Sequence, residues 1–220
     1  MDLWRITWFT ILMAGGATAL ALPVGVPMAW YLARRRFPGR TLIETVVSLP
    51  LVMPPVATGL ILLMLFGRRG PLGRLLAEAG VDVVFTWKAV VLAMAVMGFP
   101  LLVRTVRVGF EQVDRRFEQV AATLGAGPVR VFFTISLPLA WPTVVAGAVL
   151  AFARALGEFG ATIMIAGSIP GVTRTLAVAI YSSAETGQDA AAVGLLAISI
   201  AIAFGALWCS NRLAERGARA

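Results

Sequence analysis

The feature that most constrains the fold of this chain is a series of five apolar segments, each near the length that crosses a lipid bilayer. A crossing takes about 20 residues of helix, and the 220-residue sequence is 59% hydrophobic with a mean hydropathy of +0.87. A soluble domain of this length could not bury so much apolar surface, so lipid must be its solvent. Only helices and closed barrels satisfy their backbone in lipid, and the alternating strands of a barrel are absent. We therefore predict an all-α integral membrane protein, a single transmembrane domain over residues 1–220 with spans at about 6–32, 43–66, 83–103, 143–165 and 190–209.

The composition also excludes several kinds of chemistry. The sequence has one cysteine, Cys209, and no histidine, which excludes a disulfide framework, a Cys/His zinc site and histidine-based catalysis. Its only lysine, Lys88, is not part of a phosphate-binding P-loop. We predict that the chain is not an enzyme and holds no metal or cofactor. If ATP drives its activity, another subunit hydrolyses it.

The basic residues predict the orientation of the chain in the membrane. The net charge is +8, but the arginines flank the apolar segments instead of forming one soluble basic face, so we predict no nucleic-acid partner. With the N-terminus outside and the C-terminus in the cytoplasm, 12 of the 19 basic residues lie inside, 6 lie outside, and Arg154 lies within a span. Arg68, Arg69 and Arg74 fall outside and count against this topology, whereas Arg216 and Arg219 support it.

Residues 107–138 form the only long polar interruption and would lie in the cytoplasm. Val113, Phe117, Val120 and Leu124 recur at helical spacing, so they share one apolar face of a short helix. Gly125 would end that helix in a left-handed conformation. A turn at 126–128 and a second helical piece at 129–135 would complete a hairpin. The hairpin is either a helix lying on the membrane surface or an element that docks into a groove of another protein.

The second span is interrupted by the prolines Pro50, Pro54 and Pro55. These prolines free backbone carbonyls, which lipid tolerates only where they face protein or a water-filled path. The segment is either a kinked packing helix or a lining of a transport path, with Ser48 and Thr58 as its few hydroxyl groups.

The fourth span contains the charged residues Arg154 and Glu158. A carboxylate at mid-membrane costs about 2.5–3.5 kcal/mol on insertion scales, so it should face a partner or a cavity. Arg154 is four residues earlier and on the same helix face. The two residues form either a local structural pair or part of a gate.

The polar loop resembles the cytoplasmic motif of ABC-importer permeases. In that family the motif runs Glu-Ala-Ala, three residues, Gly, nine residues, then Ile, one residue and Leu-Pro. This sequence has Ala121, Gly125 and Ile135-Ser136-Leu137-Pro138 at the matching positions. It departs from the motif at Gln119 and Val120, where the family often has Glu and Ala.

The resemblance extends over nearly the whole chain. LPLVMPPVATG, MGFPLLVRTVR and ARALGEFGATIMIAGSIPGVTRTLAVAIY are similar to the permeases of molybdate ABC importers, and sulfate permeases share the Gly-Glu-Phe-Gly run. The resemblance implies a type I importer fold in the bacterial inner membrane, with a second copy of the chain, a cytosolic ABC ATPase dimer and a periplasmic oxyanion-binding protein as partners. It places the coupling to the ATPase on Glu118, Ala121, Leu124, Gly125, Ala126 and Gly127.

The functional hypothesis is therefore an ATP-driven importer of molybdate or tungstate that works by alternating access. A permease for sulfate or another oxyanion is the near alternative. A stand-alone secondary transporter or channel that uses Glu158 as an ion site is less favoured, and a membrane-embedded enzyme least. Which oxyanion is carried would be decided mainly by the binding protein.

Overall fold

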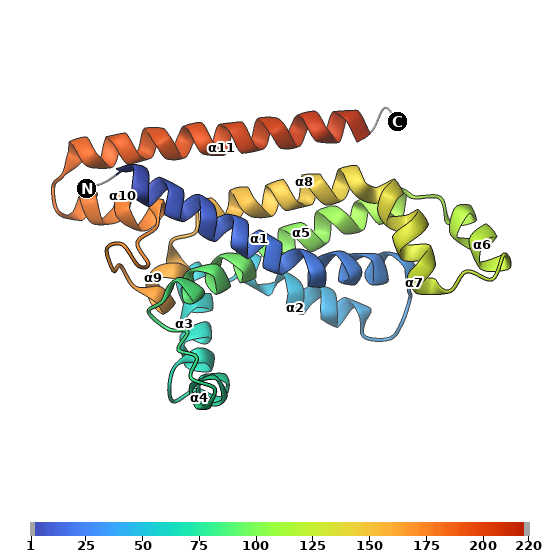
Figure 1. Ribbon diagram of the computed structural model, residues 1–220, viewed down its shortest axis with the longest axis horizontal. Coiled ribbons are helices and arrows are strands. Elements are labelled where there is room, and N and C mark those ends of the chain that lie inside the picture. The colour runs from blue at the N-terminus through green and yellow to red at the C-terminus, as the bar shows by residue number, and fades with distance from the viewer. Residues whose placement is uncertain (1–2, 218–220) are drawn as a thin grey trace.

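Three long helices form the centre of the molecule: α1 (Leu3–Arg34), α5 (Trp87–Gln112) and α8 (Leu137–Leu156). In this computed structural model they run side by side along the long axis (Figure 1). The structure describes residues 3–217, without the side chains of residues 209–211 and 213–217. The predicted cytoplasmic Arg219 and the side chain of Arg216 therefore lie outside the described part. Residues 3–217 contain helices and turns but no strand, which confirms the all-α prediction.

Small side chains let the three central helices approach closely. Ala14 on α1 and Ala89 and Ala93 on α5 are fully buried in one apolar cluster. Gly147 on α8 lies against α5, where an added Cβ would come within 2.9 Å of Val106. Helices in lipid gain little from the hydrophobic effect and associate through close packing, so small residues at their contacts are expected.

The second predicted span is two helices, α2 (Arg40–Val52) and α3 (Pro55–Phe66), which meet at an angle of 112°. Met53 is extended, with φ −69° and ψ 148°, as steric contact with a following proline favours. Pro55 then starts α3 at a first-turn position, where its missing N–H costs nothing. The prolines therefore produce a sharp corner in place of one kinked helix over 43–66.

The fourth predicted span also differs in its ends. A helical run begins at Pro128 with α7 (Pro128–Val131), passes through a π-helical turn, η1 (Phe132–Ser136), and continues as α8 to Leu156. The chain breaks at 157–159 before the short helix α9 (Gly160–Ala166). The predicted range of 143–165 thus began too late and crossed this break. Hydropathy did not reveal the break, because the residues on both sides of it are apolar.

The remaining elements lie around this centre. The 67–85 segment, predicted as a loop, contains α4 (Pro71–Glu78), and the 168–189 segment, also predicted as an external loop, contains α10 (Leu176–Glu185). Helix α6 (Arg115–Thr123) lies in the predicted cytoplasmic loop, and α11 (Asp189–Gly217) packs against α8 and α10. Helix α5 begins four residues later than predicted and continues nine residues further, to Gln112.

The two broken segments pack directly on each other. An added Cβ at Gly59 of α3 would lie 2.7 Å from the Cα of Ala161 in α9. An added Cβ at Gly160 would lie 2.8 Å from Pro55. The corner between α2 and α3 therefore contacts the break before α9, and only glycine allows backbones to approach so closely.

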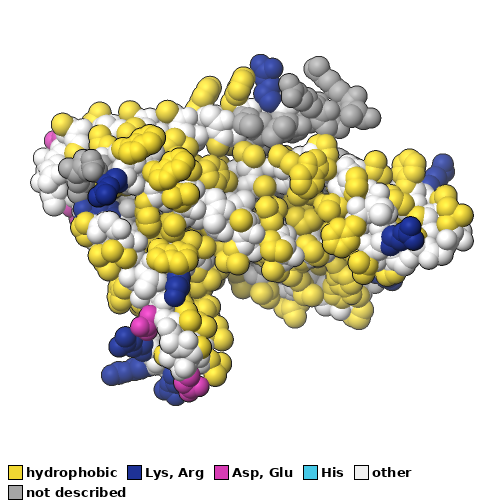
Figure 2. Space-filling view, in the orientation of Figure 1, with side chains coloured by type: hydrophobic (Ala, Val, Ile, Leu, Met, Phe, Trp, Pro, Cys, Tyr) yellow, Lys and Arg dark blue, Asp and Glu magenta, His cyan; other side chains and the backbone are white. Residues whose placement is uncertain are grey.

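The arrangement has two distinct ends separated by an apolar body. Helices α6 and α7 lie at one end together with the last turns of α11, whereas α4, α10 and the start of α1 lie towards the other (Figure 1). Hydrophobic side chains cover most of the visible body, and most of the visible Lys and Arg lie near its ends (Figure 2). Four described helices are long and apolar enough to cross a membrane, and the number is five, as predicted, if the bent α2–α3 pair is counted as one span.

Candidate functional site

The predicted hairpin forms between α5 and α8, and its helix has a defined start and end. The Asp114 carboxylate accepts a hydrogen bond of 2.9 Å from the Arg116 backbone N–H, which caps the start of α6. Gly125 has φ +84°, the left-handed conformation predicted for it. The N–H groups of Gly125 and Ala126 donate to the carbonyls of Ala122 and Ala121, both at 3.0 Å, which is the Schellman ending of a helix.

The apolar face of α6 is not covered by its own chain. Phe117, Val120 and Leu124 are 56%, 59% and 83% exposed, and Val129 after the turn is 69% exposed. Of the predicted apolar face, only Val113 packs against the core. The hairpin projects from the end of the bundle (Figure 1). An apolar surface on a projecting polar element is the form of a docking surface.

Glu118 points towards its own bundle, away from the exposed apolar face. Its Oε1 accepts hydrogen bonds from Arg34 Nε at 2.9 Å and from the Ser136 hydroxyl at 2.6 Å. Arg34 also donates to the Val113 carbonyl at 3.0 Å. The side chains of Arg34 and Glu118 are only 7% and 16% exposed. Glu118 therefore fixes α6 against the end of α1 and against η1.

The other predicted coupling residues occupy the tip of the hairpin. Leu124, Gly125 and Gly127 are exposed, and Ala121 and Ala126 are half-buried. Ala126 and Glu118 line a pocket of about 390 Å³ between the hairpin and the end of α1. The tip is therefore accessible, whereas the base of the hairpin is fixed to the bundle.

The predicted path residues on α2 and α3 lie in four different environments. Pro50 lies within α2, and Pro54 and Pro55 make the corner. Thr58 is buried, and its hydroxyl has no hydrogen-bond partner among the described residues. Of this group, Ser48 lines the pocket described next.

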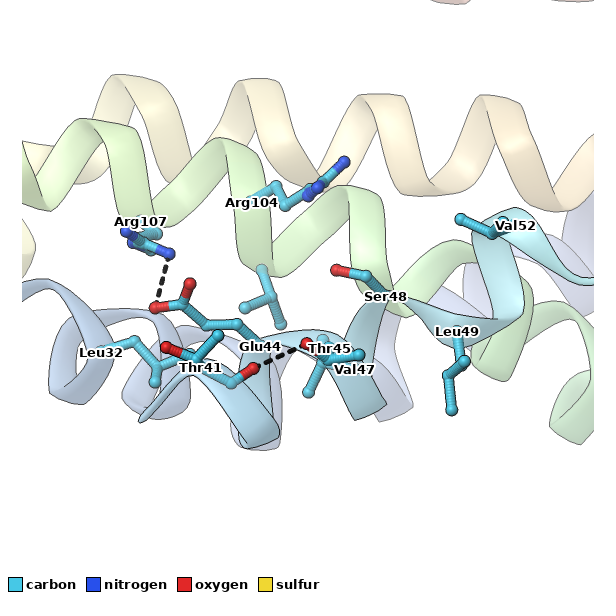
Figure 3. Close-up of a pocket in the computed structure, with 11 residues that line it drawn as sticks. Leu32, Thr41, Glu44, Thr45, Val47, Ser48, Leu49, Val52, Arg104 and Arg107 are labelled. Atoms are coloured by element: carbon cyan, nitrogen blue, oxygen red, sulfur yellow. Dashed lines mark hydrogen bonds and ion pairs between the residues drawn. The ribbon is translucent and has the colours of Figure 1, made fainter. Parts of the chain in front are cut away.

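A pocket of about 440 Å³ lies between α2 and α5 (Figure 3). Its walls combine apolar side chains with a polar set from both helices. Four polar residues recur along α2 at helical spacing and therefore lie along one side of it. The polar lining residues are Thr41, Glu44, Thr45, Ser48, Arg104 and Arg107.

Most of the charge near this pocket is paired. Arg107 contacts Glu44 at 2.9 Å and Glu111 at 2.8 Å. Arg40 contacts the same two carboxylates at 2.7 Å and 3.6 Å. Two positive and two negative charges thus form a neutral network that joins α2 to α5.

Arg154 and Glu158 lie away from this pocket, at the corner between α8 and α9. Arg154 contacts Glu158 Oε2 at 2.8 Å, and Glu158 Oε1 accepts from the Ala161 N–H at 2.8 Å. Glu158 is 1% exposed. This geometry matches the local structural pair, with Glu158 also capping the first turn of α9.

Several of these residues are not predicted from the sequence. Arg34, Arg104 and Arg107 indicate only the orientation of the chain there, and no sequence pattern marks Glu44 as a partner of Arg107. The spacing of Thr41, Glu44, Thr45 and Ser48 on one helix face was a detectable signal for a polar lining. The residues of α5 that face this lining are determined by how α5 packs on α2, and the spacing within one helix does not show them.

Comparison with curated proteins gives strong matches over nearly the full length. The molybdenum transport system permease protein ModB of Escherichia coli (strain K12) is 48% identical over 214 residues, covering 96% of this chain and 93% of the relative. The sulfate transport system permease protein CysT of Salmonella typhimurium is 37% identical, covering 96% of this chain and 76% of the relative.

Solved structures share the fold at low sequence identity. A subunit in an inward-facing structure of the MetNI methionine ABC transporter has a TM-score of 0.73 at 18% identity, covering 99% of this chain and 97% of that one. Residues 21–216 match the family described as "Binding-protein-dependent transport system inner membrane component". The chain therefore belongs to the family of binding-protein-dependent transport system inner membrane components, with the fold of an ABC-importer permease, and it is a transport subunit and not an enzyme.

Proposed function

We propose that this chain is the permease subunit of an ATP-driven importer that moves molybdate or tungstate across the bacterial inner membrane. The observation that carries the proposal is the 48% identity to a molybdenum transport permease over 96% of the chain. The whole chain would act as one transmembrane domain. Its partners would be a second copy of itself, a cytosolic ABC ATPase dimer and a periplasmic oxyanion-binding protein.

The exposed face of α6 is the proposed contact with the ATPase. Phe117, Val120 and Leu124 would insert into a groove of that subunit, and the Gly125 turn would set the angle of the hairpin. Because Glu118 joins α6 to α1 and η1, movement of the docked hairpin would reach the membrane helices. ATP binding would open the path outward to receive the anion, and hydrolysis would return it inward.

The proposed orientation places the N-terminus outside and the C-terminus in the cytoplasm. It is supported by the arrangement in Figure 1, where α4 and the start of α1 lie towards one end of the molecule. Helix α6 and the end of α11 lie at the opposite end. The test uses single cysteines in a Cys209→Ser background and a membrane-impermeant maleimide added to spheroplasts. Leu75→Cys on α4 should be labelled in intact spheroplasts, whereas Arg36→Cys, at an exposed position between α1 and α2, should be labelled only after permeabilisation. The reverse pattern would refute the orientation.

The substrate is tested by uptake in proteoliposomes that contain the chain, its ATPase and its binding protein. Uptake of labelled molybdate should require ATP, and excess tungstate should block it while excess sulfate should not. The 37% identity to a sulfate permease favours sulfate as the second candidate. Equal competition by sulfate would move the assignment to that class, and uptake without ATP would exclude an ATP-driven importer.

A further inference from the structure

The pocket between α2 and α5 contains one arginine whose charge is not balanced. Arg40, Glu44, Arg107 and Glu111 neutralise one another. Arg104 lines the same pocket, and among the described side chains it makes no hydrogen bond or ion pair. The pocket thus presents a net positive charge from a guanidinium that is free to bind.

Arg104 carries this unpaired charge well inside helix α5, away from the end of the helix. It lies eight residues before the end of α5 at Gln112, which corresponds to about 12 Å along the helix axis. Charged groups within spans are costly unless they meet a partner, a water-filled cavity or the membrane surface. Here the cavity is present, and its volume of about 440 Å³ accommodates on the order of ten water molecules.

A hydroxyl group faces this guanidinium across the pocket. Ser48 on α2 points towards the side of the pocket where Arg104 lies (Figure 3). Among the described residues, neither the Ser48 nor the Thr41 hydroxyl has a hydrogen-bond partner, in contrast to Thr45, which donates to the Thr41 carbonyl at 2.8 Å. A guanidinium supplies several N–H donors in one plane, and a hydroxyl adds another donor, which together suit an oxygen-rich anion.

We propose that Arg104 and Ser48 form a weak binding site for a tetrahedral oxyanion on the translocation path, on the side of the Arg107–Glu44 pair that lies farther from the hairpin. This inference rests on the proposed import function and adds the residues of the path that contact the substrate. One guanidinium in a wet, open pocket binds loosely, so the anion can both enter and leave. The neutral network beside it fixes α2 to α5 and leaves Arg104 as the group that attracts the anion.

The test compares Arg104→Gln with wild type in proteoliposomes containing the complete transporter. Uptake of labelled molybdate should fall about tenfold or more, since a hydrogen bond to a charged group is lost. ATP hydrolysis stimulated by the binding protein should stay within about twofold. Arg104→Lys should recover part of the uptake, because it keeps the charge but loses the planar donors. Ser48→Ala should give a smaller loss of uptake.

Arg36→Gln is the matched control, because Arg36 is an exposed arginine near the same end of the molecule and outside this pocket. Its uptake should equal that of wild type. The site would be refuted if Arg104→Gln transported normally, or if its uptake and ATP hydrolysis fell together.

The phosphate of an anionic lipid headgroup is also an oxygen-rich anion that a guanidinium could bind. The assay is therefore repeated in membranes of phosphatidylcholine alone and in membranes that also contain phosphatidylglycerol. A defect in both membranes supports a substrate site. A defect only with phosphatidylglycerol would show that Arg104 binds lipid and would refute the proposal. If the wild-type complex carries no molybdate, tungstate or sulfate, the proposed function itself has failed.

Discussion

The Arg34 guanidinium donates a 2.9 Å hydrogen bond to Glu118, although 84 residues separate the two along the chain. Arg34 lies in the last turn of α1, and Glu118 lies in the first turn of α6. With the Ser136 hydroxyl, the pair fixes the hairpin that contains α6 to the end of α1 and to η1.

Glu118→Gln should weaken the connection between the hairpin and the bundle. The charge-assisted hydrogen bond contributes about 1.5–3 kcal/mol in a partly buried setting. ATP hydrolysis should then continue with reduced molybdate uptake, which is measured as molybdate transported per ATP hydrolysed. Arg34→Gln should have a similar effect, and the double variant should be little worse than either single one, since both remove one interaction. Glu78→Gln on α4 is the control. Fully additive losses would contradict the proposed pairing.

Gly125→Ala should weaken binding of the hairpin to the ATPase, and only through the backbone conformation at residue 125. No atom lies within 4 Å of an added Cβ at Gly125, but its φ of +84° costs an L-residue about 1–2 kcal/mol. The affinity for the ATPase should therefore fall about five- to thirtyfold, measured by co-purification at graded concentrations.

Gly127→Ala is the matched control for Gly125→Ala. Gly127 has the same open surroundings but an ordinary φ of −69°. The control should bind the ATPase as wild type does, and equal losses in both variants would show that space at the tip matters more than its backbone conformation.

Leu124→Ser should reduce ATPase binding without affecting the fold. Leu124 is 83% exposed, so this chain gains little from its apolar surface, whereas burial of a leucine in a partner contributes about 1.5–3 kcal/mol. We expect at least about tenfold weaker ATPase binding with an unchanged melting temperature. Leu75→Ser, at an exposed leucine on α4, should change neither quantity. Unchanged binding in the Leu124 variant would place the docking surface elsewhere.

Glu158→Ala should destabilise the permease strongly. It removes the partner of Arg154 and the acceptor for the Ala161 N–H, and Glu158 is 1% exposed. Breaking a buried pair in this way costs about 3–5 kcal/mol, visible as a lower melting temperature in detergent. Glu158→Gln keeps an acceptor oxygen and should lose less. A variant of normal stability that has lost transport would instead identify Glu158 as an ion site.

Gly59→Ala should separate α3 from α9. The added Cβ would lie 2.7 Å from the Cα of Ala161, and backbone cannot move aside as a flexible side chain can. Overpacking of this kind costs about 1–3 kcal/mol and should lower the melting temperature. Gly15→Ala on α1 meets no atom within 4 Å and should be neutral or slightly stabilising. Equal stability of the two variants would show that the contact between α3 and α9 yields easily.

Local rules predicted some features of this structure well. The left-handed Gly125 and the disruption at Pro54 and Pro55 depend on backbone sterics within a few residues, which the sequence displays directly. The apolar segments indicated the long helices that could cross a bilayer, because length and hydropathy determine which helices can do so.

Other features depend on contacts between distant segments. Glu118 belongs to an amphipathic helix, but only the positions of Arg34 and Ser136 show that it faces inward. The pairing of Glu44 with Arg107 requires the packing of α2 on α5, and the contact of the α2–α3 corner with α9 likewise joins distant segments. Periodicity within one helix contains none of this information.

The helical run from Pro128 to Leu156 has a mechanical consequence. Its longest part, the 20 residues of α8, corresponds to about 30 Å and reaches from η1 to the corner occupied by Arg154 and Glu158. Helix α7 lies at an angle to it (Figure 1). A helix of this length resists compression, so a tilt applied at one end displaces the other as a lever does. The π-helical turn at 132–136 is the one segment of this run with wider hydrogen-bond spacing, and it contains Ser136, the point at which Glu118 is attached. The lever therefore has its most deformable segment beside its attachment to the hairpin, and its stiff arm extends into the membrane.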